Sequence, residues 1–313
     1  MRPLILIPAW SFYLLGAETG RRQAAASDTS LLFGAPPVFY HGFGCLTAIL
    51  VAAYLINQVF DRESDLLNRK GFYLTQGIFS VRAVVMMAFM AFLFASWFYR
   101  FVDDGQRAPL VIALVLSMFY SMPPLRLVAR PFVDLLANAA GYGGVAFVAG
   151  YAAYHDVTAT AVLLALPYVC LVGATFLFTT VLDIDGDKAS GKITTSVVIG
   201  VKPSFVTACL MTAAGLIPAL LVSWRLYSDP LAAIILFVCL LAFVMYVVRS
   251  GDRIRQASSN AVQAATVFVT LPAKIVRIEY AVLLVPLLLA ARLYFRARFG
   301  IIYPGPAPGG KQT

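Results

Sequence analysis

Carboxylate side chains gather in two short windows of an otherwise apolar chain. Asp61 and Asp65 lie in the first window, which begins at Asn57, and Asp183 and Asp187 lie in the second. Each window ends a long apolar run, so its carboxylates are expected where a membrane helix meets water. Carboxylates are hard ligands that suit Mg²⁺ better than a soft metal. The two windows therefore predict a magnesium-dependent enzyme inside a membrane.

Helical spacing places these polar groups on two helix faces. Asn57, Asp61 and Asp65 follow one another at intervals of four residues, and Asp183 and Asp187 share that interval. Residues four apart lie on one face of an α-helix. Like charges at this spacing destabilise a helix by roughly 0.2–0.5 kcal/mol per pair, so a cation is expected to compensate them. We interpret all of them as metal ligands and the aspartates as catalytic, whereas Glu63 and Asp185 should point elsewhere.

Basic residues lie beside both windows, where a substrate phosphate would need them. Mg²⁺ is typically held by one or two carboxylates together with substrate phosphates, so two carboxylate sets facing one cavity predict a bridged diphosphate. The positive bias of cytoplasmic loops explains any single one of these basic residues equally well. The predicted substrate contacts are Asn57 and Arg69 in and after the first window, Arg126 between the windows, and Lys188 and Lys192 after the second.

The composition indicates a chain that uses lipid as its main solvent. Hydrophobic residues make up 61% and charged residues 12%, against about 25% charged residues in soluble domains. A membrane helix needs roughly 20 mostly apolar residues, and the sequence offers about nine such stretches. We therefore predict an all-α membrane protein with a single domain over 1–300 and a disordered tail over 301–313. The predicted spans are 3–17, 38–60, 80–100, 108–121, 131–153, 159–182, 203–224, 230–249 and 276–296.

The net charge of +9 is distributed unequally between the two sides that these spans define. Loops on the side of both carboxylate windows carry most of the Lys and Arg residues, which marks that side as cytoplasmic and places the N-terminus there. We therefore predict a multi-pass protein of a bacterial or archaeal cell membrane whose active site faces the cytoplasm. The sequence offers no basic and aromatic soluble domain, which argues against a nucleic-acid partner.

Three motifs, taken in their order and spacing, resemble the UbiA superfamily of intramembrane prenyltransferases. They are Asn57-x-x-x-Asp61-x-x-x-Asp65 followed by Asn68-Arg69, then Tyr120-Ser-Met-Pro-Pro-Leu-Arg126, then Asp183-Ile-Asp-Gly-Asp187-Lys-Ala-Ser-Gly-Lys192. The combination is specific, although no single motif is. The resemblance implies nine helices in a bundle around a central cavity, two Mg²⁺ ions that hold an isoprenyl diphosphate, and transfer of the prenyl group to a lipophilic acceptor.

The sequence departs from the family pattern around the first window. Gln58 stands where the family usually has an aspartate, and residues 68–72 and 75–77 replace its usual Asn-Arg-Pro and Pro-Ser-Gly stretches. These departures argue against a 4-hydroxybenzoate enzyme. The Tyr-Ser-x-Pro-Pro stretch that begins at Tyr120 is similar to that of chlorophyll-synthase-like members.

The expected chemistry is ionisation of an allylic diphosphate in a cavity shielded from water. Magnesium and basic residues would neutralise the charge that builds on the diphosphate as the C–O bond breaks. Aromatic faces can stabilise the remaining allylic cation, and the candidates are Tyr54, Tyr120, Tyr142 and Phe176. Asn138 is polar within a predicted span and is a candidate to orient the acceptor, with a helix–helix hydrogen bond as the alternative.

Three other classes of membrane protein share some of these features. A CDP-alcohol phosphotransferase has its acidic residues in one continuous motif, whereas here the windows lie 118 residues apart (183 minus 65). A transporter is disfavoured because acids at helix ends beside basic residues suit a diphosphate better than an ion path at the bilayer midplane. A terpene cyclase of the same superfamily would use the same ionisation without an acceptor and stays open. The motifs do not distinguish quinone precursors, chlorophyll-type precursors and lipid alcohols as acceptors, nor do they fix prenyl length or oligomeric state.

Overall fold

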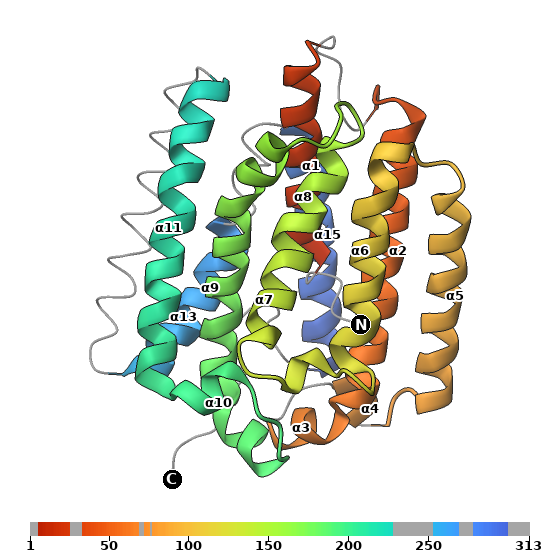
Figure 1. The fold of residues 1–313 in the computed structure, drawn as a ribbon. Coiled ribbons are helices and arrows are strands. Elements are labelled where there is room, and N and C mark those ends of the chain that lie inside the picture. The colour runs from red at the N-terminus through yellow and green to blue at the C-terminus, as the bar shows by residue number, and fades with distance from the viewer. Residues whose placement is uncertain are drawn as a thin grey trace.

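The computed structural model describes residues 6–25, 33–68, 72–75, 77–227, 253–268 and 278–299. Within these residues the chain folds into helices without a β-strand, and the long helices stand side by side in a bundle (Figure 1). The predicted all-α fold is confirmed. The predicted span 230–249 and the predicted tail 301–313 lie outside the described residues, and the single domain over 1–300 stays a prediction.

The long helices are connected by shorter ones at the lower end of the bundle in Figure 1. The short elements are α3 (Arg62–Leu67), α4 (Phe72–Thr75), η2 (Leu127–Ala129) and α10 (Thr195–Ile199). A continuous helical run contains α7 (Val133–Ala139), the π-helical turn η3 (Ala140–Val145) and α8 (Ala146–Tyr151). The other long helices are α1 (Leu6–Gln23), α2 (Pro37–Phe60), α5 (Val81–Tyr99), α6 (Asp104–Ser121), α9 (Ala159–Ala189), α11 (Val201–Tyr227), α13 (Ile254–Phe268) and α15 (Ile278–Phe299).

Four helical runs among the described residues are long and apolar enough to cross a membrane: α2, α5, the run from Val133 to Tyr151, and α9. In lipid, a spanning helix satisfies its backbone hydrogen bonds internally, which suits these apolar runs. The protein is therefore a multi-pass membrane protein. Every predicted span except 230–249 coincides with a helix, whereas the total of nine spans stays a prediction.

Helix α13 is the one described long helix that the apolar pattern does not predict. Polar residues such as Gln256 and Ser258 interrupt its apolar residues, so the segment resembles a loop between spans. In the structure it packs against α9 (Figure 1), where Ala261 is buried in one cluster with Ala174 and Phe178. Small side chains allow a helix of mixed polarity to approach its neighbour closely.

Helices α1 and α8 pack backbone against backbone along a seam of glycines. A Cβ atom on Gly150 would lie 2.7 Å from the carbonyl carbon of Tyr13, and one on Gly16 would lie 2.8 Å from that of Phe147. Gly20 meets the backbone of Tyr151 in the same way. Protein interiors are already close-packed, so no side chain fits at these positions. We call this contact, defined by Gly16, Gly20 and Gly150, the α1–α8 seam.

A single methyl group in the seam is expected to destabilise the protein. Gly150→Ala should lower the free energy of unfolding by about 2–3 kcal/mol, because two helix backbones must separate to admit the methyl group. The corresponding fall in melting temperature is roughly 5 °C or more, measured by a thermal melt in detergent. Gly105→Ala is the matched control, since its nearest atoms would be 3.7 Å and 3.9 Å away. Equal melting temperatures for both variants would contradict the seam.

The helix ends that carry the two carboxylate windows lie at the same end of the bundle. Helices α2, α6 and α9 end there, and α7 and α11 begin there (Figure 1). Antiparallel neighbours joined by short loops produce this arrangement, because every second helix end returns to the same side. The bundle thus places residues that are far apart in sequence around one mouth.

Candidate active site

A cavity of about 220 Å³ lies between α2, α6, the α7–η3 run and α9. The last turns of α2 and α9, together with the segment after α9, contribute polar residues, whereas earlier turns contribute apolar and aromatic ones. The earlier turns lie deeper in the bundle, so the cavity has a polar mouth and an apolar interior. The mouth includes Asn57, Asp61, Asp183, Asp187 and Lys192, and the interior includes Leu50, Tyr54, Leu116, Tyr142 and Phe176.

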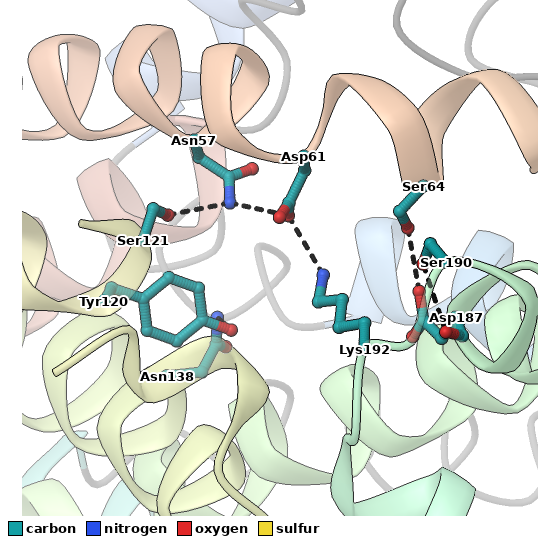
Figure 2. Close-up of polar contacts among 9 residues, drawn as sticks. All are labelled: Asn57, Asp61, Ser64, Tyr120, Ser121, Asn138, Asp187, Ser190 and Lys192. Carbon is teal, nitrogen blue, oxygen red and sulfur yellow. Dashed lines mark hydrogen bonds and ion pairs between the residues drawn. The ribbon is translucent and has the colours of Figure 1, made fainter. Parts of the chain in front are cut away.

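Asp61 lies at the centre of the polar mouth, between the end of α2 and the start of α3 (Figure 2). Its Oδ2 atom accepts a hydrogen bond of 2.9 Å from Asn57 Nδ2. The same oxygen forms an ion pair with Lys192, at 3.0 Å from Nζ. Asn57 Nδ2 also donates to Ser121 Oγ at 2.9 Å, which ties α2 to α6. The other carboxylate oxygen, Oδ1, is buried and has no hydrogen-bond partner among the described residues.

A second contact joins the two carboxylate windows directly. Ser64 Oγ donates a hydrogen bond of 2.9 Å to Asp187 Oδ1, and both residues are buried (Figure 2). Next to this contact, Gly186 leaves room for the side chain of Asn68, whose Nδ2 would lie 2.6 Å from a Cβ at that position. The two windows, separated in sequence, therefore form one surface at the end of the bundle.

Three further predicted residues line the cavity: Asp183, Tyr120 and Asn138. Asn138 Nδ2 lies 3.5 Å from the hydroxyl of Tyr120, to which it donates. Asn138 thus joins α7 to α6 and also contributes to the cavity wall. Both interpretations of this residue, acceptor orientation and a helix–helix hydrogen bond, are compatible with its position.

The other predicted residues that the structure describes do not line the cavity. Asp65 is half-buried in α3, and Lys188 is exposed on α9. The spacing argument for Asp65 assumes one uninterrupted helix, but α2 ends at Phe60 and the chain bends at Asp61. Arg126 is half-buried in a left-handed backbone conformation, φ 41°, and its Nε is buried without a hydrogen-bond partner among the described residues. Arg69 lies outside the described residues.

The two acids that were expected to point away from the site do so. Glu63 is exposed on α3 and outside the cavity lining. Asp185 forms an exposed ion pair with Arg255 at the start of α13, with 2.6 Å between Oδ2 and Nη1. The direction of a side chain along the end of α9 is therefore predictable from helical spacing.

Sequence reasoning does not select several hydroxyl residues of the site. Ser64 and Ser121 bond directly to the polar mouth, and Thr179, Thr180 and Thr194 line the cavity. Ser64 and Ser121 each lie inside a motif that the sequence does single out. Serine and threonine are too frequent in membrane helices for type alone to mark them, so only their place inside the motifs is a signal.

Aromatic side chains form much of the cavity interior. Tyr54 of α2 and Tyr142 of η3 meet edge to face, with ring centroids 5.7 Å apart and an angle of 66° between the rings. Phe176 of α9 and Tyr120 of α6 complete this part of the lining. Aromatic faces attract cations through their quadrupole, so the wall can stabilise positive charge without supplying water.

The donors at the mouth fit a hard divalent cation that is completed by substrate. The described residues contain no ready-made group of three or more His, Cys, Asp and Glu side chains at metal-binding geometry. Mg²⁺ needs fewer protein ligands, because it takes water and substrate phosphate oxygens as well. The unpartnered Oδ1 of Asp61 is a buried carboxylate oxygen that still requires a cation or donor. Asn57, Asp61, Asp183 and Asp187 are the oxygen donors that such an ion would meet.

Comparison with known proteins decides the family. The model of the UbiA prenyltransferase family matches residues 23–271, which is most of the chain and includes both carboxylate windows. The chain belongs to the UbiA prenyltransferase family. The resemblance of the three motifs is thereby confirmed, and so is the predicted enzyme class of this UbiA family member, a prenyltransferase.

Two curated relatives of this UbiA family member have names that refer to different compounds. The chain is 30% identical to the lycopene elongase/hydratase of Halobacterium salinarum over 206 residues, which is 62% of this chain and 69% of the relative. It is 25% identical to the bacteriochlorophyll synthase 34 kDa chain of Chloroflexus aurantiacus over 169 residues, 54% of this chain and 52% of that one. The second match thus spans about half of that relative's length.

Solved structures of UbiA homologues share the fold of this chain. A homologue from Archaeoglobus fulgidus bound to GPP and Mg²⁺ superposes with a TM-score of 0.60 at 18% identity, covering 88% of this chain and 100% of that one. The apo structure of a homologue from Aeropyrum pernix K1 gives a TM-score of 0.60 at 14% identity, with 85% and 97% covered. At these identities the likeness concerns the fold.

Proposed function

We propose that this prenyltransferase moves a prenyl group from an isoprenyl diphosphate to a lipophilic acceptor and releases diphosphate in a Mg²⁺-dependent reaction. The observation that carries the proposal is the cavity itself, which joins a carboxylate and lysine mouth to an aromatic interior. A prenyl diphosphate has the same division, because its diphosphate is anionic and its tail is apolar. The diphosphate belongs at the mouth and the tail in the interior.

Each polar residue of the mouth has a role in this proposal. Asp61, Asp183 and Asp187, with Asn57, are the proposed ligands of Mg²⁺, which when bound would neutralise diphosphate charge in the ground state and in the transition state. Lys192 is the proposed diphosphate contact, because its ammonium group already lies at the mouth, 3.0 Å from Asp61. Asp65 as a metal ligand, and Arg69, Arg126 and Lys188 as diphosphate contacts, remain predictions from the sequence.

The interior supplies the second half of the chemistry. Breaking the bond between the allylic carbon and the diphosphate oxygen leaves the electron pair on oxygen and a cation on the prenyl group. Tyr54, Tyr120, Tyr142 and Phe176 line the space next to the mouth and would face that cation. Water would capture the cation as an alcohol, so the apolar wall also protects the reaction by exclusion.

The acceptor is proposed to be lipophilic, since it must enter the same apolar interior. The names of the two curated relatives refer to lycopene and to bacteriochlorophyll. They support the predicted chlorophyll-type precursor and add a polyene to the other predicted acceptors, which are quinone precursors and lipid alcohols. The proposed location is a bacterial or archaeal cell membrane with the N-terminus and the mouth on the cytoplasmic side, as the distribution of Lys and Arg indicates.

The test is a transfer assay with purified protein in lipid nanodiscs. Geranylgeranyl diphosphate, Mg²⁺ and an extract of apolar lipids are supplied, and diphosphate release and lipid masses are measured together. Diphosphate release that depends on the extract is expected, with a product whose mass equals that of an acceptor in which one prenyl group has replaced one hydrogen, the hydrogen leaving as a proton. Release without extract, with a product that contains only the prenyl carbons, would identify a cyclase instead. No release under any of these conditions would refute the proposal.

A further inference from the structure

Asp134 is a buried carboxylate that does not line the cavity and that the proposed chemistry does not use. It lies in the first turn of α7 and is completely inaccessible to solvent. Its Oδ2 accepts a hydrogen bond of 2.8 Å from the backbone N–H of Thr195, and its Oδ1 accepts from the Thr195 hydroxyl. The N–H of Leu135 also donates to Oδ1, at 2.8 Å. A buried carboxylate is costly unless it is fully bonded, and these donors satisfy it.

Thr195 connects this carboxylate to the polar mouth. It is the first residue of α10, and its hydroxyl also accepts a hydrogen bond of 2.7 Å from the N–H of Phe132. The preceding residue, Thr194, lines the cavity, and Lys192 lies three positions before Thr195. The Thr195 hydroxyl thus donates to Asp134 and accepts from Phe132, and both bonds hold the start of α10 against the start of α7.

The segment between α9 and α10 is therefore held by hydrogen bonds at both of its ends. At the first end, the N–H of Lys192 donates to the carbonyl oxygen of Asp187 at 2.8 Å, and Ser190 Oγ donates to the same oxygen at 3.1 Å (Figure 2). At the second end, Thr195 is held by Asp134. Within the first end, between Ser190 and Lys192, Gly191 has a φ of +70°, a turn conformation that glycine adopts readily. Lys192 projects from this short fastened segment to Asp61.

We infer that Asp134 is a positioning residue that, through Thr195, holds Lys192 at the mouth of the cavity where it meets Asp61 and the substrate diphosphate. The part that concerns the diphosphate rests on the proposed function. A lysine has a long flexible side chain, so a fixed backbone reduces the number of places its ammonium group can occupy. A preorganised cation stabilises developing charge without reorganisation during the reaction. A carboxylate suits this role because it accepts from both groups of Thr195 and offers no competing donor.

A second contact makes the inference testable without unfolding the protein. Thr180 of α9 and Ser196 of α10 share a buried hydrogen bond of 2.6 Å between their hydroxyl groups. This bond keeps α10 packed on α9 when the Asp134 contact is lost. Asp134→Asn should therefore fold, but an amide nitrogen cannot accept hydrogen bonds, so one of the groups that face it loses its acceptor.

The first measurement is hydrogen–deuterium exchange of the backbone amides over 190–199, with no substrate present. Asp134→Asn should speed exchange in this segment about tenfold, because it weakens a hydrogen bond to a charged acceptor. Thr195→Val, which replaces the hydroxyl with a methyl group and keeps the backbone N–H, should have a smaller effect in the same direction. Asp156→Asn makes the same chemical change at an exposed site outside the cavity lining and should leave the segment unchanged.

The second measurement separates positioning from general stability by a double-mutant cycle. In the wild-type background, Asp134→Asn should raise the KM for geranylgeranyl diphosphate about tenfold or more, with a smaller change in kcat. In a Lys192→Ala background the same substitution should change KM little, since the group that it positions is gone. A KM effect of equal size in both backgrounds would show a purely structural role and overturn the inference.

The two measurements also distinguish failure of the inference from failure of the proposed function. Unchanged exchange over 190–199 in Asp134→Asn overturns the positioning of this segment, whatever the protein catalyses. Faster exchange in a protein that releases no diphosphate in its wild-type form would refute the proposed function and the diphosphate role of Lys192, while Asp134 would remain the residue that fixes the segment. If Asp134→Asn does not fold, both measurements are made on Thr195→Val and read in the same way.

Discussion

Asp61→Ala is expected to reduce prenyl transfer by roughly 10³-fold, because it removes the carboxylate at the centre of the mouth. The substitution deletes the partner of Lys192 and of Asn57 as well as the unpartnered oxygen that a metal ion would meet. Asp183→Ala should have an effect of similar size, since this residue faces the same cavity from α9. The measurement is the initial rate of diphosphate release in nanodiscs at saturating Mg²⁺.

The control for this prediction is Asp185→Ala, which removes a carboxylate from the same turn of α9. Asp185 is exposed, pairs with Arg255 and lies outside the cavity lining, so the rate should stay within about threefold of the wild type. Full activity of Asp61→Ala and Asp183→Ala would contradict the assignment of the polar mouth as the active site. A loss in Asp185→Ala as large as theirs would show that the charge of the region, and not its geometry, matters.

Removal of Mg²⁺ is expected to abolish turnover, with a fall of roughly 10³-fold or more when EDTA is in excess. The mouth holds carboxylate and amide oxygens, which bind Mg²⁺ weakly by themselves and more strongly when a diphosphate completes the coordination. Restoring Mg²⁺ should restore the rate. Calcium should restore it poorly, because it prefers longer bonds and more ligands than octahedral magnesium sites provide.

A binding measurement separates the metal's effect on chemistry from its effect on substrate affinity. Calorimetric titration with geranylgeranyl diphosphate should show weak binding in EDTA and binding at least about tenfold tighter with Mg²⁺. Asp61→Ala should lose most of that difference, whereas Asp185→Ala should keep it. Turnover that continues in excess EDTA would contradict the magnesium-dependent mechanism.

The convergence of the two carboxylate windows is predictable because it depends on coarse features. Apolar runs of membrane length define where helices end, and the parity of those helices places the ends of α2 and α9 on the same side. Helical spacing then separates Asp187, which is buried beside Ser64, from Asp185, which is exposed. Residues that act through position on one regular helix are thus accessible to sequence reasoning.

The remaining features of the site depend on irregular backbone and on long-range contacts. The bend at Asp61 separates Asp65 from the helix face that carries Asn57. No residue type in that window predicts the bend. Asp134 meets Thr195 across 61 positions in sequence, and a lone acid at the start of a span resembles an ordinary helix end. Helix α13 is not predicted, because polar residues interrupt its apolar residues. Hydropathy measures the preference of a segment for an apolar environment, and it does not detect the burial of one helix face against another helix.

The glycine seam between α1 and α8 restricts how lipophilic molecules reach the interior. Two backbones in direct contact at Gly16, Gly20 and Gly150 leave no gap there for an alkyl chain, and separating them would expose peptide groups to hydrocarbon. These helices should consequently move as one rigid wall. Any lateral route by which a polyprenyl chain leaves the bilayer for the cavity must pass between other pairs of helices, and spin labels across this wall should report a constant separation with and without substrate.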